Sequence, residues 1–370
     1  MEPFKNELCY QNARRIGACL KRAYSAFPLE RFSRGLERAL EPLELKQRVC
    51  LLADRLEAGL PAHPPEMFRI LIGALAADEN DSAGLRGFLV WPLTELVARC
   101  GLNHFDESMA ALGEMTRRFT AEFALRPFLR THRERTLAQL HVWCGHPDEH
   151  VRRLVSEGSR PLLPWGGKLP FLLEPPFPTL YLLDPLCLDP SDYVRLSVSN
   201  HLNDLSKAQP AMVLATLTRW RLAAPDDRRL DRLARHACRT LLKDGHPGAL
   251  EFHGYGQAKA LMLETCALTK SAVALGGHLE YRLVVRNTSR HTVRVMFDYA
   301  ILHRKANGGL APKVFKGRTR ELSAGECWEI TGRHVFRRVT TRVYHAGGHV
   351  FEVRLNGKAF PGLPFELDVG

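Results

Sequence analysis

Residues 147–152 read PDEHVR, and residues 190–195 read PSDYVR. The two segments are 43 residues apart, and the match extends to Val155-Ser156 against Val198-Ser199. A helical sequence that repeats with a period of about 40–47 residues is typical of HEAT-like arrays, in which stacked helix pairs bury one continuous apolar core. The repeat therefore predicts a helical solenoid with a curved surface along its stacked helices.

The second copy of the repeat is expected to form a helix from about Ser191 to Ser206. Ser191 suits the N-cap, and Asp192 places a carboxylate in the first turn, where the helix dipole favours negative charge. One face is apolar and is expected to be core: Val194, Val198, Leu202 and Leu205. A separate face is polar, with Asn200, Asp204 and Lys207 at i, i+4 and i+7. Spacing alone favours a solvated stripe with an Asp204–Lys207 ion pair.

The first copy is expected to form a helix of the same kind. Its apolar face should contain Val151, Leu154 and Val155. Arg153 and Glu157 are four residues apart and suited to pair, and Gly158 suits a C′ position that ends the helix. A proline-containing loop follows and leads through Pro164 to Trp165. Spacing alone favours a Trp165 that plugs the core.

The C-terminal part of the chain has a different pattern from about Thr269 onward. Short strand-like segments appear at 279–285 (LEYRLVV), 293–297 (VRVMF) and 349–355 (HVFEVRL). Turn signals separate them: 287–289 (NTS), 307–309 (NGG), 347–348 (GG) and 356–357 (NG). Several strands with such turns in about 100 residues are typical of an immunoglobulin-like β-sandwich. We therefore predict a mainly α chain, with a HEAT-like repeat domain over 1–258 and an immunoglobulin-like β domain over 259–370.

The composition is that of an ordinary globular protein, with 45% hydrophobic and 25% charged residues. The net charge of +12 is unevenly distributed. Residues 255–370 contain 18 Lys and Arg against 9 Asp and Glu, whereas residues 1–254 contain 34 against 31. A basic module on a nearly neutral array suggests a polyanionic partner, most simply nucleic acid, although a basic surface with no partner fits equally well.

Cysteines and apolar runs constrain the class further. The nine cysteines include no C-x-x-C pair, which argues for a reducing compartment and against a disulfide framework or a zinc site. The group His141, Cys144, His146 and His150 matches no standard ligand spacing, so no metal is expected. No apolar run is long enough for a membrane span, and the N-terminus does not have the pattern of a signal peptide.

Two long strings resemble the AlkC branch of the AlkC/AlkD DNA alkylation repair glycosylases. They are 151–166 (VRRLVSEGSRPLLPWG) and 193–207 (YVRLSVSNHLNDLSK), and the opening Glu2-Pro3-Phe4-Lys5-Asn6 is also similar. The resemblance implies a monomeric, cytoplasmic bacterial enzyme that uses no cofactor. It also implies a substrate, double-stranded DNA containing alkylated bases, chiefly 3-methyladenine and 3-methylcytosine, and excision without base flipping. An immunoglobulin-like C-terminal module is similar to one AlkC subgroup.

The resemblance also implies roles for four residues. An alkylated ring nitrogen makes the base cationic and a good leaving group, so catalysis requires stabilisation of an oxocarbenium-like sugar and placement of a water, both of which carboxylates can do. Glu157 and Asp204 match the family's motifs as catalytic carboxylates. Trp165 matches an aromatic residue that contacts the sugar, where cation–π attraction can stabilise the developing positive charge. Glu122 matches a supporting carboxylate.

DNA contacts are expected from basic and polar residues that would hold the phosphate backbone without reading sequence. In the helical part the candidates are Arg152, Arg153, Arg160, Lys168, Arg195, His201, Asn203 and Lys207. In the β domain, Lys316 and Arg318 lie in a strand-like segment with Lys313 and Arg320.

Two other functions remain open for a helical repeat protein of this composition. One is a DNA-binding damage sensor without catalysis, which would bind DNA in a salt-sensitive way and release no base. The other is a protein-binding adaptor, which would have no affinity for duplex DNA at low salt.

Overall fold

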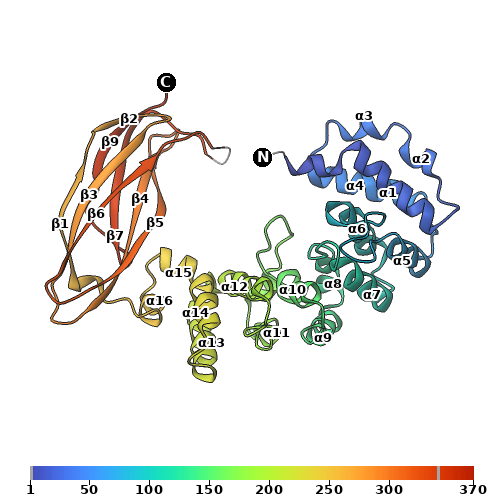
Figure 1. Cartoon of the computed structure of the whole chain (residues 1–370), viewed down its shortest axis with the longest axis horizontal. Helices are drawn as coiled ribbons and strands as arrows, with labels where there is room; N and C mark the ends of the chain where they lie inside the picture. The colour runs from blue at the N-terminus through green and yellow to red at the C-terminus, as the bar shows by residue number, and fades with distance from the viewer. Residues whose placement is uncertain (1–2, 340–341) are drawn as a thin grey trace. The chain divides into compact units, whose positions relative to one another are not determined.

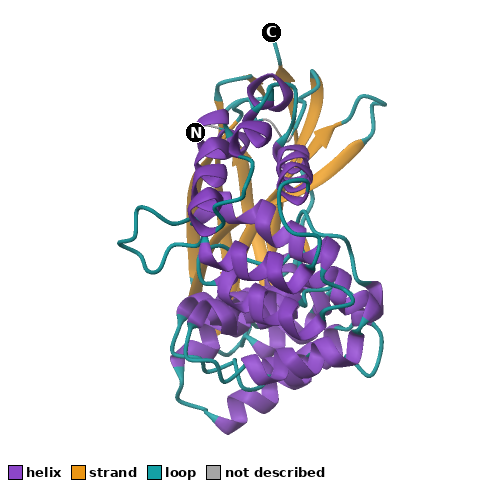
Figure 2. Ribbon diagram, turned by 90° about the vertical axis from the view of Figure 1, so that its right-hand side faces the viewer, coloured by secondary structure: helices purple, strands orange, loops and turns teal. Residues whose placement is uncertain are grey.

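The computed structural model describes residues 3–339 and 342–370, so that Glu2 of the N-terminal motif lies outside the described residues. The chain divides into two compact units. The first comprises Met1–Gln209 with Ala224–Ala237, and the second comprises Pro210–Ala223 with Cys238–Gly370. Helices and strands occupy different parts of the chain: in the described residues the α-helices end at Phe252 and the strands begin at Leu261. Figure 2 colours the two kinds of element separately.

The first unit is helical, and its elements follow one another in chain order (Figure 1). They are η1 (Phe4–Leu8), α1 (Tyr10–Ala23), α2 (Leu29–Ser33), α3 (Leu36–Leu40), α4 (Leu45–Glu57), α5 (Pro64–Gly73), η2 (Gly87–Val90), α6 (Trp91–Cys100), α7 (Phe105–Thr116), α8 (Leu125–Thr131), α9 (Arg133–Trp143), α10 (Glu149–Gly158), η3 (Pro170–Leu173), α11 (Leu180–Leu183), α12 (Asp192–Ser206) and α14 (Arg228–Ala237). Within the described residues, no helix has both the length and the hydropathy to cross a bilayer.

The predicted repeat is present in this unit. Its two copies form α10 and α12, which pack against each other, and α14 packs on the other side of α12. The apolar residues predicted for the core of both helices are buried: Val151, Leu154, Val155, Val194, Val198, Leu202 and Leu205. The HEAT-like prediction is confirmed, and successive helices of the array stand side by side.

The second unit contains three helices and nine strands within its described residues. The helices are α13 (Pro210–Ala223), α15 (Arg239–Lys243) and α16 (Pro247–Phe252), and η4 (Ala258–Ala260) leads into the strands. The strands are β1 (Leu261–Leu268), β2 (Ala272–Ala274), β3 (His278–Asn287), β4 (Val293–Arg304), β5 (Leu310–Leu322), β6 (Cys327–Val335), β7 (Gly347–Leu355), β8 (Lys358–Ala359) and β9 (Leu363–Asp368).

The strands form two sheets that enclose an apolar core. One sheet has the order β1-β3-β6, and the other has the order β2-β9-β7-β4-β5, with β8 paired to β7. Buried residues alternate with more exposed ones along β3 and β7, as the alternating sequence of these segments predicts. Aromatic rings from both sheets meet in the middle, where the ring centroids of Tyr281 and Phe351 are 4.8 Å apart. The predicted immunoglobulin-like sandwich is confirmed.

Two of the turn predictions have different outcomes. Asn356 and Gly357 have positive φ angles of 44° and 77° and connect β7 to β8, as the Asn-Gly signal predicts. Gly347 and Gly348 are not a turn: they open β7 and pair with Leu367 and Glu366 of β9. The predicted domain boundary after residue 258 stays a prediction.

Candidate active site

The start of α10 is set by its N-cap, and its last turn is positioned by contact with α8. The Asp148 carboxylate accepts a hydrogen bond of 2.8 Å from the His150 backbone N–H and caps the helix. Gly158 is the last helical residue and not a left-handed C′ residue, so this detail of the sequence interpretation was wrong. A Cβ at this position would lie 2.5 Å from Leu125 Cδ1 of α8. The absence of a side chain at Gly158 therefore allows the last turn of α10 to pack closely against α8.

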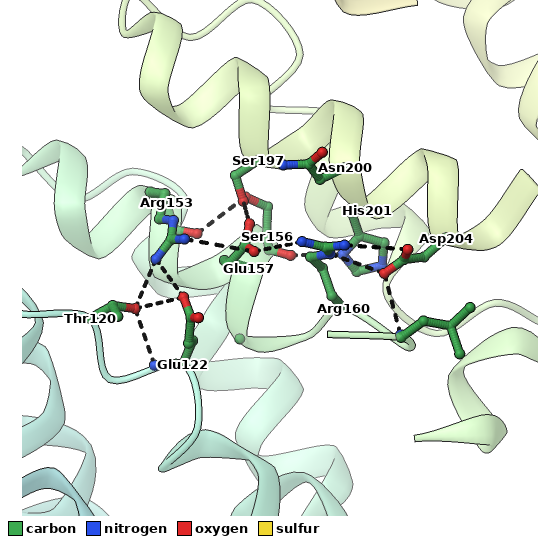
Figure 3. A network of polar contacts seen from close by, with 12 residues as sticks. Thr120, Glu122, Arg153, Ser156, Glu157, Arg160, Ser197, Asn200, His201 and Asp204 are labelled. Carbon is green, nitrogen blue, oxygen red and sulfur yellow. Dashed lines mark hydrogen bonds and ion pairs between the residues drawn. The ribbon is translucent and has the colours of Figure 1, made fainter. Parts of the chain in front are cut away.

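Glu157 lies in that last turn with its carboxylate fully engaged (Figure 3). Its exposed fraction is 5%. Arg160 Nη1 donates to Oε1 at 2.7 Å, and Ser197 Oγ of α12 donates to Oε2 at 2.7 Å. Ser156 Oγ donates in turn to Ser197 Oγ at 2.7 Å. The predicted ion pair with Arg153 is present at 3.7 Å but is the longest of these contacts.

Asp204 of α12 is buried, which overturns the solvated-stripe interpretation of its helix face. Its exposed fraction is 1%. Arg160 Nε donates to Oδ2 at 3.0 Å and Arg160 Nη2 to Oδ1 at 3.3 Å, while the Leu162 backbone N–H donates to Oδ2 at 3.3 Å. The expected Lys207 ion pair is present at 3.5 Å. One guanidinium therefore connects Asp204 to Glu157, and the loop after α10 supplies it.

A second buried arginine supports this loop from α8. Arg126 Nη1 donates to the Arg160 carbonyl at 2.9 Å and to the Gly158 carbonyl at 3.4 Å, and Nε donates to the Gly167 carbonyl at 2.5 Å. Burial lowers the pKa of Arg126 to about 10, and the nearby Arg130 adds to the effect. Burial also acts to lower the pKa of Arg160, but the bond to Asp204 and the charge of Glu157 outweigh it and hold that pKa above its usual value.

Glu122, with an exposed fraction of 9%, is the carboxylate of the network that lines an open groove. It lies in the turn between α7 and α8, where Thr120 Oγ1 donates to Oε2 at 2.8 Å and Arg153 Nη1 donates to the same oxygen at 2.7 Å. Glu122 and Arg153 line an open groove of about 710 Å³ together with Phe119 and Tyr193. Neither Glu157 nor Asp204 lines that groove. The network thus runs from an open side at Glu122 to a buried side at Asp204.

Trp165 is exposed and does not plug the core. Its exposed fraction is 58%, and its φ of 62° is in the left-handed region. The Lys46 ammonium donates to the Trp165 carbonyl. Phe4, which is half exposed, contacts the indole edge-on at a centroid distance of 6.3 Å and stacks on Phe88 at 5.7 Å. Trp165 lines a small pocket with Phe123 and Arg126, separate from the groove at Glu122, and Arg126 connects this pocket to the loop of Arg160.

His201 is part of the interior and not a phosphate contact. Its Nδ1–H donates to the Ser156 carbonyl at 2.8 Å, which leaves Nε2 to accept from Thr179 Oγ1 at 2.9 Å. Burial lowers the pKa of His201 to about 4, so the ring is neutral at neutral pH. Asn203 is buried too. We therefore remove His201 and Asn203 from the predicted DNA-binding set, because a duplex cannot reach a buried side chain.

The predicted arginine contacts also lie largely inside the array. Arg152 Nε and Nη2 donate to the two oxygens of Asp189 at 2.6 and 3.0 Å, and Nη1 donates to two backbone carbonyls. Arg195 is buried and donates to the Asp189 carbonyl and the Asp192 carboxylate. We assign Arg152 to the packing between repeats, Arg195 to the start of α12, and Arg160 to the carboxylate network. Arg153 lines the open groove and remains a predicted DNA contact, as do the exposed candidates: Lys168, Lys207, Lys316 and Arg318.

Comparison with known proteins identifies the fold and the family. The solved structure of the *Pseudomonas fluorescens* alkylpurine DNA glycosylase AlkC, bound to DNA containing an abasic site analog, matches all of this chain and all of its own chain. Its TM-score is 0.91 and its sequence identity is 34%. The chain belongs to the AlkC family. "Uncharacterized protein YhaZ" of *Bacillus subtilis* (strain 168) is 37% identical to this AlkC-family chain over 329 residues, which are 88% of each protein. Residues 262–369 match the family model "Uncharacterised protein YhaZ, C-terminal Ig-like domain".

Sequence reasoning missed several members of this AlkC-type site. Ser156 and Ser197 lie within the two strings that carry the resemblance, so their pairing had a signal that spacing alone did not reveal. Thr179 and Arg126 lie outside those strings and had none. Phe4 was quoted as part of the N-terminal motif, but its contact with Trp165 joins residues 161 positions apart.

Proposed function

We propose that this AlkC-family chain is a DNA glycosylase that hydrolyses the N-glycosidic bond of alkylated bases in double-stranded DNA, without base flipping. Its expected substrates are 3-methyladenine and 3-methylcytosine. One observation carries the proposal: an arginine-bridged carboxylate network is hydrogen-bonded to the loop that carries an exposed tryptophan. The full-length similarity to an alkylpurine DNA glycosylase supports it.

The chemistry needs little protonation of the leaving group. A base alkylated at a ring nitrogen carries a positive charge, so the C1′–N bond breaks with its electron pair moving to the base, which leaves neutral. Positive charge then develops on the deoxyribose, and a fixed negative group stabilises it. Water adds to C1′ and gives up one proton to a carboxylate.

We divide these tasks among the carboxylates by their access to the groove. Glu122 lines the open groove, so we assign it the proton from the attacking water. Glu157 and Asp204 are held by Arg160 and supply a fixed field beneath the sugar. Trp165 offers its exposed face to the deoxyribose, where a developing cation is attracted to the ring. Exposed Lys168 is suited to contact phosphate nearby.

The test is a base-release assay on duplex DNA treated with a methylating agent, with released bases identified by mass spectrometry. Glu157→Gln and Asp204→Asn are expected to lower the rate of release by about 100-fold, a loss typical of removing one electrostatic contact to a transition state. Binding to a duplex with an abasic-site analogue should persist in both variants. Asp189→Asn is the matched control, because Asp189 is a buried, arginine-paired carboxylate outside the network.

Each outcome has a distinct meaning. If the protein binds duplex DNA in a salt-dependent way and releases no base, it is a damage sensor and the proposal fails. If it does not bind duplex DNA at low salt, the adaptor function takes its place. If Glu157→Gln and Asp204→Asn keep full activity, the roles given to the carboxylates are wrong. If Asp189→Asn loses as much activity as they do, the loss reflects folding and not chemistry.

A further inference from the structure

A single guanidinium bridges the two carboxylates assigned to catalysis. We propose that Arg160 is the positioning residue of this pair: it fixes Glu157 and Asp204 relative to each other across two successive repeat helices. This inference rests on the proposed function, since it gives Arg160 a role in that same site. It replaces the phosphate contact expected from the sequence.

The geometry of the bridge uses the planar shape of arginine. The edge formed by Nε and Nη2 faces the two oxygens of Asp204 at 3.0 and 3.3 Å, and Nη1 reaches Glu157 Oε1 at 2.7 Å. A planar, five-donor fork fixes both the distance and the relative orientation of its two partners. A lysine ammonium keeps the charge but has no such plane, so it cannot impose that orientation.

Arg160 is itself fixed at its backbone. Its N–H donates to the Glu157 carbonyl at 3.2 Å, and its carbonyl accepts from Arg126 at 2.9 Å. Pro161 follows and restricts the backbone conformation of residue 160. The side chain is buried, whereas a phosphate contact requires an accessible guanidinium. Hydrogen bonds at the N–H and at the carbonyl therefore hold the backbone of Arg160 on both sides of the side chain that forms the bridge.

The charges around the bridge balance within its buried part. The carboxylates of Glu122, Glu157 and Asp204 lie with the guanidiniums of Arg126, Arg153 and Arg160, and Lys207 pairs with Asp204 at the exposed rim. His201, packed beneath, is neutral at neutral pH because burial lowers its pKa to about 4. Removing the charge of Arg160 would leave a buried carboxylate uncompensated and put folding at risk. Arg160→Lys is therefore the informative change, because it keeps the charge and removes the fork.

The matched control, Arg152, lies on α10, the helix that precedes the loop of Arg160. Arg152 makes an equivalent two-point contact with Asp189 between repeats, at 2.6 and 3.0 Å, away from the network. In the full-length protein, Arg160→Lys should lower kcat by about 10- to 100-fold, the loss expected when catalytic groups are misplaced by about 1 Å. Its Kd for a duplex with a neutral tetrahydrofuran abasic site should change by less than about threefold, because no phosphate contact is lost. Arg152→Lys should leave kcat within about threefold of wild type, because it changes only packing between repeats.

A binding measurement tests the same idea without base release. A duplex with a cationic pyrrolidine abasic-site analogue resembles the charged sugar, so wild type should bind it more tightly than the neutral tetrahydrofuran duplex. Arg160→Lys should reduce this preference by about threefold or more, because the carboxylates are no longer held under the cation. Arg152→Lys should keep it.

The results separate this inference from the proposed function. If Arg160→Lys keeps kcat but weakens binding to the neutral abasic duplex by more than about threefold, Arg160 is a phosphate contact and the inference is wrong. If Arg160→Lys and Arg152→Lys lose activity in parallel with stability, the role of Arg160 is structural and the inference is also wrong. If wild type releases no base, the proposed function fails, and the inference is then tested by the preference for the cationic analogue alone. A preference that is present in wild type and lost in Arg160→Lys supports the inference. A wild type without this preference overturns it.

Discussion

Acidification should destabilise the helical array through His201, and the size of the effect follows from the burial of its ring. The neutral imidazole donates from Nδ1 to the Ser156 carbonyl and accepts at Nε2 from Thr179. A second proton would place an N–H against a hydroxyl oxygen and a charge in a fully buried site. Burial is accordingly the main cause that lowers the pKa of His201 to about 4.

The sign follows from where protons bind. In the unfolded chain histidine titrates near about 6.5, so between that pH and about 4 the unfolded state binds a proton that the folded state does not. The stabilising contribution is fully present above about pH 6.5 and is lost as the pH falls toward 4. From about pH 7 to about pH 5 the loss in free energy of unfolding is about 2 kcal/mol from this residue.

The assay is urea unfolding of the full-length protein, followed by far-ultraviolet circular dichroism at about pH 7 and about pH 5. In the β domain, burial also lowers the pKa of His303 to about 3 and that of His334 to about 4, so the whole protein loses more stability than His201 alone accounts for. His201→Gln should reduce the loss by about 2 kcal/mol, because glutamine can donate and accept without titrating. Thr179→Val should lower stability yet keep the pH dependence. If wild type and His201→Gln lose equal stability on acidification, the reasoning is refuted.

Three further predictions concern stability and DNA binding. Asn356→Ala should lower the free energy of unfolding by about 2–3 kcal/mol, measured by chemical denaturation, because the buried amide makes three hydrogen bonds to the backbone; an unchanged midpoint would contradict this. Gly158→Ala should cost about 1–2 kcal/mol, since crowding against Leu125 exceeds the helix-propensity gain of alanine, and a more stable variant would show that the contact relaxes freely. The double change Lys316→Gln with Arg318→Gln should lower the slope of log K against log salt by about 2 if both contact phosphates, and an unchanged slope would remove β5 from the DNA interface.

The fold was predictable where local pattern and burial agree. The repeat at 147–152 and 190–195 predicted two helices because each copy pairs an N-terminal turn signal with an inward apolar stripe. Strand β1 was missed: the expected change of pattern was placed at Thr269, whereas β1 begins at Leu261. This strand lies at a sheet edge, has few buried residues and shifts register between Leu263 and Thr265, so its sequence lacks regular alternation.

The site was predictable in its residue types and less so in its geometry. Spacing placed Asp204 on a polar face and so favoured solvent, because periodicity cannot reveal that the loop after α10 covers that face with Arg160. Proline content favoured a buried Trp165, but the indole is exposed, and the left-handed backbone at this residue had no signal in the sequence. Both errors have one physical cause: a loop between repeats contacts residues that are distant in sequence.

The loop that carries Trp165 is immobilised before any ligand arrives. Lys46 binds its carbonyl, Gly166 N–H bonds to the Leu163 carbonyl at 3.1 Å, and Arg126 holds Gly167. Fixing the backbone of one residue costs about 1–2 kcal/mol of conformational entropy, and these bonds meet that cost for the loop in the free protein. Partners whose surface fits this loop conformation should therefore bind with little ordering penalty, and partners that need another loop conformation should bind more weakly.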